Sequence, residues 1–337
     1  MQLPKSPVRR SCACLILAGM VAAGGARAAE LLSLETRIPL ADVGGRIDHM
    51  AIDPVRNRLL VAELGNGTVD AIDLAAGHSV KVKRINGLKE PQGVGWAPQA
   101  DLVIVANAGD GTVRFFRGED LAPAGMLRLG DDADNVRIDP ANGRAIVGYG
   151  NGGLAVIDPA QHAKIADIRL AAHPESFQLD GTTGRVFANV PDAPQIAVVD
   201  LAARKQIATW STPGLRSNFA MALAEGGALL AVVFRSPAKL VLYDTKSGAA
   251  VASLDTCHDA DDVFFDGKRG RLYISCGEGV VDVVAADGSA WRSLGRVETS
   301  SGARTSLFVP ERDRLYVAAR AGLLGSEAAI LVFRPVP

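Results

Sequence analysis

The sequence predicts an all-β fold, a seven-bladed β-propeller with four antiparallel strands in each blade. Three observations support this fold class: a repeat of 41 to 44 residues occurs seven times, each repeat holds up to four short strand patterns, and a spare strand pattern stands ahead of the first repeat. A fixed period of this size is typical of an array of similar structural units. The repeats begin at Asp48, Gln92, Asp134, Glu175, Phe219, Asp261 and Thr305.

Residues 1–28 have the pattern of a signal peptide that is removed on export. A basic stretch around Arg9 and Arg10 precedes an apolar run at 12–23, and Ala26-Arg27-Ala28 matches a cleavage site. The paired arginines leave open whether the general secretory or the twin-arginine route is used.

The mature chain, residues 29–337, is expected to form a single propeller domain in the periplasm or outside the cell. No later apolar run in the sequence is long enough to span a membrane as a helix.

Within each repeat the order of patterns is the same. A first short strand, often ending in Asp or Pro, leads through a turn to a β-branched run such as residues 58–62. A second turn follows, then a third run such as 68–73 and a more polar fourth run such as 164–170. Short runs bounded by turn residues at regular spacing predict strands.

The two ends of the chain predict how the ring closes. The last repeat has only three strand patterns, the third at residues 329–333, whereas residues 31–40 have the pattern of a fourth strand. We predict that this N-terminal strand joins the last blade. Such closure protects strand edges that an open array would expose.

The charge balance limits the classes of partner. There are 36 Lys and Arg residues against 37 Asp and Glu residues, which gives a net charge of −1. No bulk basic field therefore attracts nucleic acid, and nucleic-acid binding is the weakest of the hypotheses.

Two cysteines, Cys257 and Cys276, remain after the expected processing. In an exported protein they predict a disulfide, because disulfides persist in oxidising compartments. A pair of buried free thiols and a metal-binding pair are the alternatives.

The repeats resemble a known family. Residues 103–107 (VIVAN) with 111–113 (GTV), and residues 58–62 (RLLVA) with 67–73 (GTVDAID), follow the cadence of YVTN-type propeller repeats. The chain is therefore similar to YncE-like proteins over essentially its whole mature length. This resemblance implies the propeller fold but leaves the chemistry open, since related propellers include proteins of unassigned role, haem- and quinone-enzyme domains and metal-dependent lactonases or lyases.

Polar residues gather at the starts of the predicted first strands. In a propeller these strands line the central channel, so their starting residues converge on one face. The candidate ligand-binding residues are Asp48, His49, Gln92, Asp134, Asn135, His173, Glu175, Arg216, Asn218, His258 and Arg304. A set of His258, Asp261 and Asp262 is the candidate metal site, because imidazole and carboxylate ligands suit a divalent metal. The alternative is an ordinary hydrated channel mouth.

The leading functional hypothesis is an exported, non-catalytic binding or scaffold propeller that uses this face for a small ligand or a protein partner. The alternative is a metal-dependent hydrolase, lactonase or lyase at the same channel mouth, with a divalent metal as cofactor. The sequence identifies no catalytic side chain. We expect the protein to be a monomer.

Overall fold

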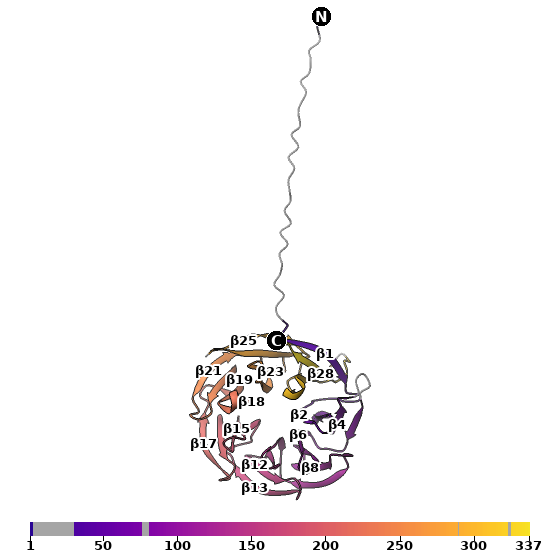
Figure 1. The fold of residues 1–337 in the computed structure, drawn as a ribbon, viewed down its shortest axis with the longest axis vertical. Helices are drawn as coiled ribbons and strands as arrows, with labels where there is room; N and C mark the ends of the chain where they lie inside the picture. The colour runs from indigo at the N-terminus through magenta and orange to yellow at the C-terminus, as the bar shows by residue number, and fades with distance from the viewer. Residues whose placement is uncertain (3–29, 76–80, 289, 323–324) are drawn as a thin grey trace. The chain divides into compact units, whose positions relative to one another are not determined.

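Seven four-stranded antiparallel sheets stand as blades around a central axis, which confirms the predicted seven-bladed β-propeller (Figure 1). The computed structural model describes residues 1–2, 30–75, 81–288, 290–322 and 325–337. Apart from its first two residues, the predicted signal peptide lies outside the described residues.

In six of the seven blades the four strands run in sequence order from the axis outwards. The first three blades contain β2 (Met50–Asp53), β3 (Arg58–Glu63), β4 (Thr68–Asp73) and β5 (Val82–Ile85); β6 (Pro91–Ala97), β7 (Leu102–Asn107), β8 (Thr112–Arg117) and β9 (Pro123–Arg128); and β10 (Ala133–Ile138), β11 (Ala145–Tyr149), β12 (Gly153–Asp158) and β13 (Ala163–Arg169).

The next three blades repeat this order. They contain β14 (Phe177–Asp180), β15 (Arg185–Val190), β16 (Gln195–Asp200) and β17 (Lys205–Ser211); β18 (Arg216–Ala224), β19 (Leu229–Ser236), β20 (Ala238–Asp244) and β21 (Ala250–Asp255); and β22 (Ala260–Asp266), β23 (Arg271–Cys276), β24 (Val280–Asp287) and β25 (Ala290–Glu298). Three short 3-10 helices are η1 (Leu64–Asn66), η2 (Glu225–Gly227) and η3 (Pro310–Arg312).

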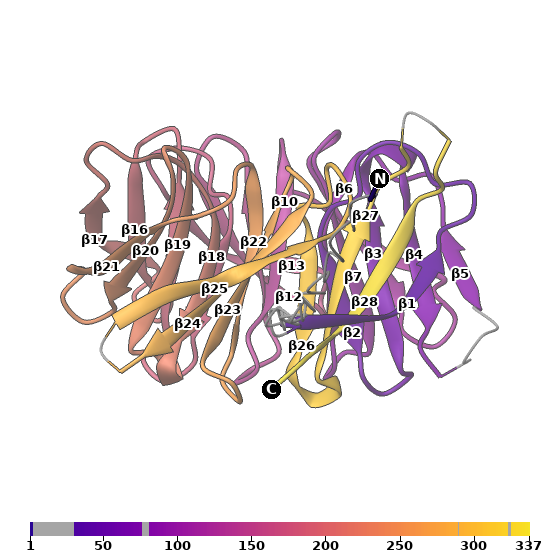
Figure 2. The same cartoon turned by 90° about the horizontal axis from the view of Figure 1, so that it is seen from above.

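The seventh blade combines the two ends of the propeller. It contains β26 (Ser306–Val309), β27 (Arg314–Ala319), β28 (Ala329–Pro335) and β1 (Leu32–Pro39). β1 pairs antiparallel with β28, from Leu32 opposite Pro335 to Pro39 opposite Ala329, and the two lie side by side in Figure 2. The predicted closure by the N-terminal strand is confirmed.

Burial differs between inner and outer strands, as the sequence patterns predict. In β3 five of six residues are buried, whereas the outer strand β13 has one buried residue of seven. Sheets that are covered on both faces need continuous apolar runs, and a strand that faces water on one side needs polar residues. The β-branched second and third runs therefore form the middle of each blade.

The hydrophobic core lies between neighbouring blades. One cluster joins Leu59 and Ile72 of the first blade to Tyr316, Ile330 and Val332 of the seventh. Burying a side chain of this size contributes about 1.5–3 kcal/mol. Each blade is thus stabilised by its two neighbours, and the ring positions the inner strands around the channel.

An aspartate at the end of several first strands caps the turn to the second strand. Asp53 is fully buried and accepts hydrogen bonds from the backbone N–H of Arg56 at 3.0 Å and from Arg58 Nη2 at 2.6 Å. Asp266 holds the matching turn in the sixth blade. This use explains why the first strand of so many repeats ends in Asp.

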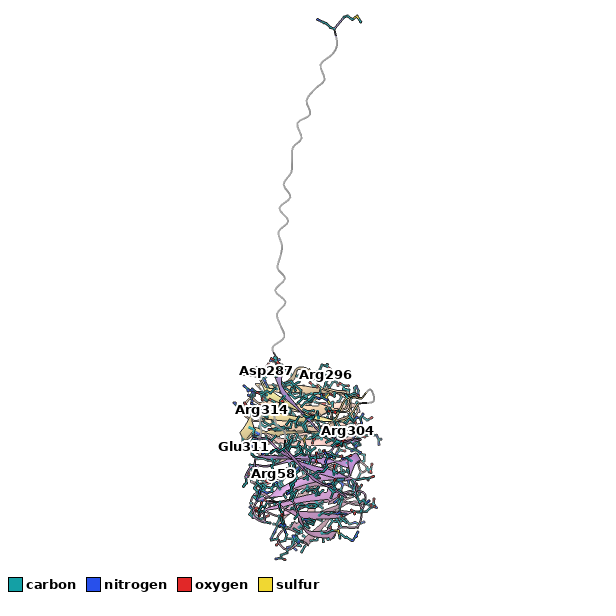
Figure 3. The ribbon with its side chains drawn as sticks, turned by 90° about the vertical axis from the view of Figure 1, so that its right-hand side faces the viewer. Arg58, Asp287, Arg296, Arg304, Glu311 and Arg314 are labelled. Atoms are coloured by element: carbon teal, nitrogen blue, oxygen red, sulfur yellow. A yellow bond between two sulfur atoms is a disulfide. The ribbon has the colours of Figure 1, made fainter. Side chains whose placement is uncertain are left out.

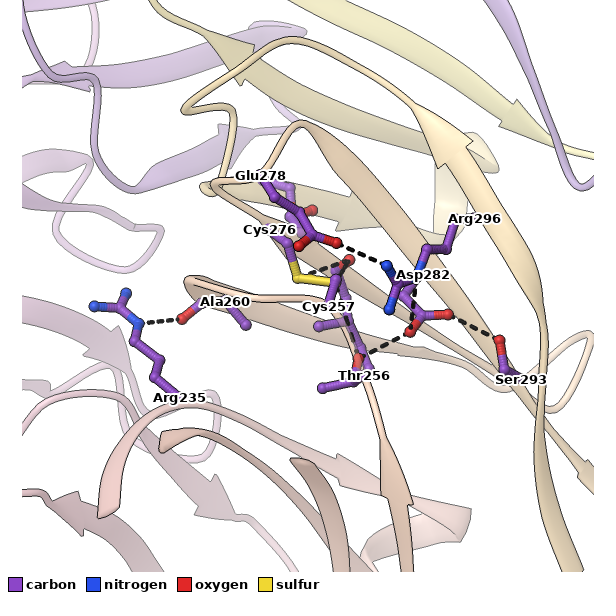
Figure 4. Close-up of a disulfide and its surroundings, with 12 residues drawn as sticks. Arg235, Thr256, Cys257, Ala260, Cys276, Glu278, Asp282, Ser293 and Arg296 are labelled. Carbon is purple, nitrogen blue, oxygen red and sulfur yellow. Dashed lines mark hydrogen bonds and ion pairs between the residues drawn. A yellow bond between two sulfur atoms is a disulfide. The ribbon is translucent and has the colours of Figure 1, made fainter. Parts of the chain in front are cut away.

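The sixth blade contains the predicted disulfide. Cys257, in the loop before β22, is bonded to Cys276 at the end of β23, with the two Cα atoms 6.0 Å apart (Figure 4). The bond fixes the loop that enters the channel face, because β22 starts three residues after Cys257. Among the described residues there is no helix with the length and apolar character needed to cross a membrane.

Candidate functional site

The first strands place equivalent residues at one mouth of the channel. Counting back five residues from the last residue of each first strand, or in the third blade from Asp139 just after β10, aligns Asp48, Gln92, Asp134, Glu175, Phe219, Asp261 and Arg304. The seventh repeat therefore begins at Arg304 and not at Thr305, because Val309 pairs with Arg314 as Asp53 pairs with Arg58. In Figure 3 Arg304 lies at the face opposite Arg58 and Arg314.

His49 links three blades at the centre of this mouth. Its Nδ1 lies 3.7 Å from Asp262 Oδ1, its Nε2 lies 3.7 Å from Asp48 Oδ1, and the side-chain amide of Asn135 lies 3.0 Å from Nε2. Asp262 is held in turn by the backbone N–H of Ser306 at 2.8 Å. This group, His49 with Asp48, Asn135 and Asp262, is called the His49 group below.

The imidazole of His49 is charged near neutral pH. Burial alone would lower its pKa, but the carboxylates of Asp262, Asp48 and Asp134 outweigh that cost and raise the pKa to about 10. A charged imidazole donates from both ring nitrogens. A half-turn of the Asn135 amide brings its oxygen, which has no partner in the described residues, to His49 Nε2 as an acceptor.

Carboxylates are crowded around the His49 group. Burial, together with the charges of Asp261 and Asp134, raises the pKa of Asp48 to about 7 against the opposing effect of His49. Burial and Asp134 likewise raise the pKa of Glu175 to about 8. Neighbouring carboxylates resist ionising together in a site that excludes water. An additional positive charge at this mouth would therefore be electrostatically favourable.

Two arginines neutralise the carboxylates on one side of this cluster. Arg235 Nη2 lies 2.6 Å and Arg304 Nε 2.8 Å from the two oxygens of Asp261. Arg304 also reaches Asp259 at 3.0 Å, and the guanidinium of Arg235 stacks 3.7 Å above the ring of Phe219. The carboxylate of Asp261 is therefore already occupied by two cations.

A cavity of about 480 Å³ opens beside these groups, between the fourth and fifth blades. Its polar lining consists of Asp132, His173, Glu175, Asp192, Arg216 and Ser217, and its apolar lining of Pro191, Pro194 and Phe219. We call it the polar-mouth cavity. Its volume lies within the range of small-ligand sites, about 300–1,000 Å³.

His173 connects the polar-mouth cavity to the channel centre. Its Nδ1 donates to the carbonyl of Gly150 at 2.7 Å, and its Nε2 lies 3.7 Å from Asp134 Oδ2. Burial would lower the pKa of His173, but Asp134, the Gly150 carbonyl and Asp132 raise it to about 9. The second oxygen of Asp134 is buried without a hydrogen-bond partner among the described residues.

The structure brings together eight of the eleven predicted ligand-binding residues. The His49 group, with Asp134 and Arg304 beside it, and the polar-mouth cavity, with His173, Glu175 and Arg216, form one connected polar region. The side chains of the other three take no part in its contacts. Asn218 is buried and binds Asn189 and the Gln195 carbonyl, Gln92 contributes a backbone carbonyl to His49 N–H, and the side chain of His258 is exposed.

The proposed metal ligands are engaged separately. Asp261 binds two arginines, Asp262 faces His49 and Ser306, and in the described part of the chain His258 forms no side-chain hydrogen bond or ion pair with either. Within that part, no group of three or more His, Cys, Asp and Glu side chains is arranged to hold a metal ion.

Sequence reasoning missed two groups at this channel. Asp132 and Asp192 line the polar-mouth cavity from loops, where no repeat register exists. Arg137 points into the channel wall at a position where the other blades carry uncharged residues. Comparing the repeats three residues beyond their aligned starts would have revealed this lone charge.

The chain is therefore a seven-bladed β-propeller with a polar cavity of about 480 Å³ at one channel mouth. Neither a protein-family model nor a curated protein sequence matches the chain. Among solved structures it is similar to a chain of Kuenenia stuttgartiensis hydrazine synthase, with 16% identity and a TM-score of 0.74, covering 88% of this chain and 98% of that one. A chain in a crystal structure of the mitotic checkpoint complex shares 13% identity with a TM-score of 0.76, covering 96% and 99%. These likenesses show the fold alone.

Proposed function

We propose that this protein is a non-catalytic binding propeller that holds a small ligand carrying a protonated amine at the polar-mouth cavity. One observation carries the proposal: the buried oxygen Asp134 Oδ1 has no hydrogen-bond partner among the described residues, and Asp134 lies 3.7 Å from His173, which lines the cavity. A buried acceptor without a donor costs about 1–3 kcal/mol, which a donating ligand would recover.

The charges of the cavity support a cationic ligand. Asp132, Glu175 and Asp192 line it with Asp134 beside them, against the two cations His173 and Arg216. Because the pKa of Glu175 is raised to about 8, much of it is neutral at pH 7. An amine that binds there would ionise Glu175 and release a proton, so binding should tighten as the pH rises from 7 to 9.

The sequence supports a proposal for the family, the location and the oligomeric state of the protein. We propose a YncE-like protein, exported and monomeric, on the strength of its YVTN-type cadence and the signal-peptide pattern at residues 1–28. The Cys257–Cys276 disulfide supports export, because disulfides persist mainly in oxidising compartments.

Titration calorimetry with two four-carbon probes tests the charge preference. We expect 1,4-diaminobutane to bind the mature protein and succinate, a dianion of similar length, not to bind. Asp134→Asn should weaken diamine binding at least tenfold, because it removes the charge that faces the ligand. The matched control is Asp139→Asn, which changes an aspartate just beyond the other end of the same strand, β10.

The proposal is wrong if succinate binds as well as the diamine, or if Asp139→Asn weakens binding as much as Asp134→Asn. Proton release gives an independent measure: the heat of diamine binding at pH 7.5 should depend on the ionisation enthalpy of the buffer in the wild type, and less so in Glu175→Gln.

A further inference from the structure

The opposite half of the channel is lined by a ring of apolar side chains. Each first strand contributes one of them: six strands do so at the position just before their last paired residue, and β10 does so at Ile138, its last paired residue. We call these residues the apolar ring: Ile52, Trp96, Ile138, Leu179, Leu223, Phe265 and Phe308. All seven line a cavity of about 510 Å³, which is within the size range of small-molecule sites.

Most of the apolar ring lies at the margin of the blade cores, whereas Phe308 is a buried core residue. Ile52, Ile138, Leu179 and Phe265 pack against four different core clusters but stay partly exposed, because one side of each faces the cavity. Apolar area that faces a cavity can still be removed from water by a ligand, at about 25 cal/mol per Å². An apolar body of matching size would therefore gain free energy there.

An arginine stands in the wall of this cavity. Arg137, next to Ile138 on β10, donates from Nη1 to the carbonyl of Val136 at 3.1 Å and lies 5.8 Å above the ring of Phe177. Across the described residues, no carboxylate oxygen lies within 4.0 Å of its guanidinium. A guanidinium has five N–H donors, so most of its donor capacity is free for a ligand.

Two members of the His49 group form part of the polar lining of this cavity. His49 and Asp262 belong to its lining, and their contact spans the channel between the first and sixth blades. Asp262 and Asp134 act on Arg137 at longer range and reduce its attraction for an anion, whereas the charged His49 beside them offsets part of that effect. The cavity is thus separate from the site proposed above and has the opposite charge preference.

We propose that the apolar ring and Arg137 form a second binding site, for a small organic anion with an apolar body, such as a medium-chain carboxylate. The anionic group binds the free N–H donors of Arg137, and the apolar body lies against the ring. A charged group in an apolar wall favours a ligand of opposite charge over a neutral one, because an unpaired buried charge is costly. This inference does not rest on the diamine site.

Octanoate and 1-octanol are the matched probes for this site. Calorimetry with the wild-type protein should show octanoate binding at least tenfold more tightly than 1-octanol. Arg137→Gln should weaken octanoate binding at least tenfold and leave 1-octanol unchanged, whereas Arg137→Lys, which keeps the charge, should retain part of the affinity. Arg144→Gln, on the exposed turn that follows β10, is the control and should bind octanoate as the wild type does.

The fluorescence of Trp96 reports where the ligand binds, without a substitution at Arg137. A bromine atom quenches tryptophan fluorescence at short range, so 8-bromooctanoate should quench the wild-type protein with saturation. Trp210 and Trp291 do not line the cavity, and Trp96→Phe should remove the saturable part of the quenching. Equal affinity for octanoate and 1-octanol, saturable quenching that survives in Trp96→Phe, or no octanoate binding at all would overturn the proposal.

Discussion

Glu175 shows how a single buried carboxylate at the polar mouth affects stability. Burial and Asp134 raise its pKa to about 8, above the ordinary value of 4.5. A carboxyl group whose pKa is raised by folding costs the folded state nothing below its unfolded pKa. The cost appears as the pH rises from about 4.5 through 8.

Replacing this carboxyl by an amide should therefore stabilise the protein at alkaline pH. We expect Glu175→Gln to raise the free energy of unfolding by about 1–3 kcal/mol at pH 8.5 and to change it little at pH 4.5. Denaturant unfolding at the two pH values measures the difference. Asp192→Asn, in a loop of the same cavity, is the control. A stabilisation of equal size at both pH values would show that the effect does not come from ionisation.

The sequence predicted which side chains start the inner strands but not how these side chains pair. Spacing along the repeat identified Asp48, His49 and Asp134 as neighbours of the channel. The contact of His49 with Asp262 joins blades that are far apart in sequence. This contact depends on the channel width and on side-chain rotamers, and neither can be predicted from a repeat pattern.

The turn between β22 and β23 depends on one buried aspartate. Asp266 accepts hydrogen bonds from the backbone N–H of Lys268 at 3.0 Å, from Arg269 Nη1 at 2.8 Å and from the hydroxyl of Tyr273 at 2.7 Å, and only 1% of its surface is exposed. Three donors lose their partner together if this carboxylate is removed. The turn then loses both its cap and its charge balance.

We expect Asp266→Ala to lower the free energy of unfolding by about 2–4 kcal/mol, because it leaves a buried hydroxyl and a largely buried guanidinium without their shared acceptor. Asp139→Ala is the matched control. Asp139 caps the equivalent turn of the third blade but binds only exposed partners, so its loss should cost about 1 kcal/mol or less. Chemical denaturation compares the two variants, and equal losses would contradict the role of burial.

The strands could be predicted wherever their burial requires a pattern of apolar and polar residues. The middle strands are continuous apolar runs because both faces are covered, and the outer strands alternate because one face is wet. The predicted register of the seventh blade was wrong by one residue. The first strand of that blade ends in Val309, at the position where most blades have the capping aspartate. Without the cap, the sequence carried no marker for the end of that strand.

The whole molecule presents two chemically different channel ends. One mouth collects carboxylates, histidines and arginines, whereas the other half of the channel is lined by the apolar ring. The His49 group separates them by bringing charges from three blades together on the axis. A ring of seven similar units produces this polarity because every first strand runs in the same direction, polar at its start and apolar near its end.

Closure of the ring is the property on which both channel ends depend. β1 covers the edge of β28 and contributes Leu32 and Ile38 to the core, with Leu40 following the strand. A chain that lacks residues 29–40 would leave β28 with unpaired backbone groups and remove three buried side chains, at about 1.5–3 kcal/mol each. Exposed edges of this kind pair with other copies.

We expect this truncated chain to lose about 5 kcal/mol of unfolding free energy and to form dimers or larger species in light scattering, whereas a chain that lacks only residues 1–28 stays monomeric. A synthetic peptide of residues 29–42, added in trans, should restore both stability and the monomer, because an added strand can satisfy the free edge. A scrambled peptide of the same composition is the control, since it cannot match the register of β28. If the truncated chain were as stable and as monomeric as the longer one, the seventh blade would not need its fourth strand, and ring closure could not be what aligns the first strands around the channel.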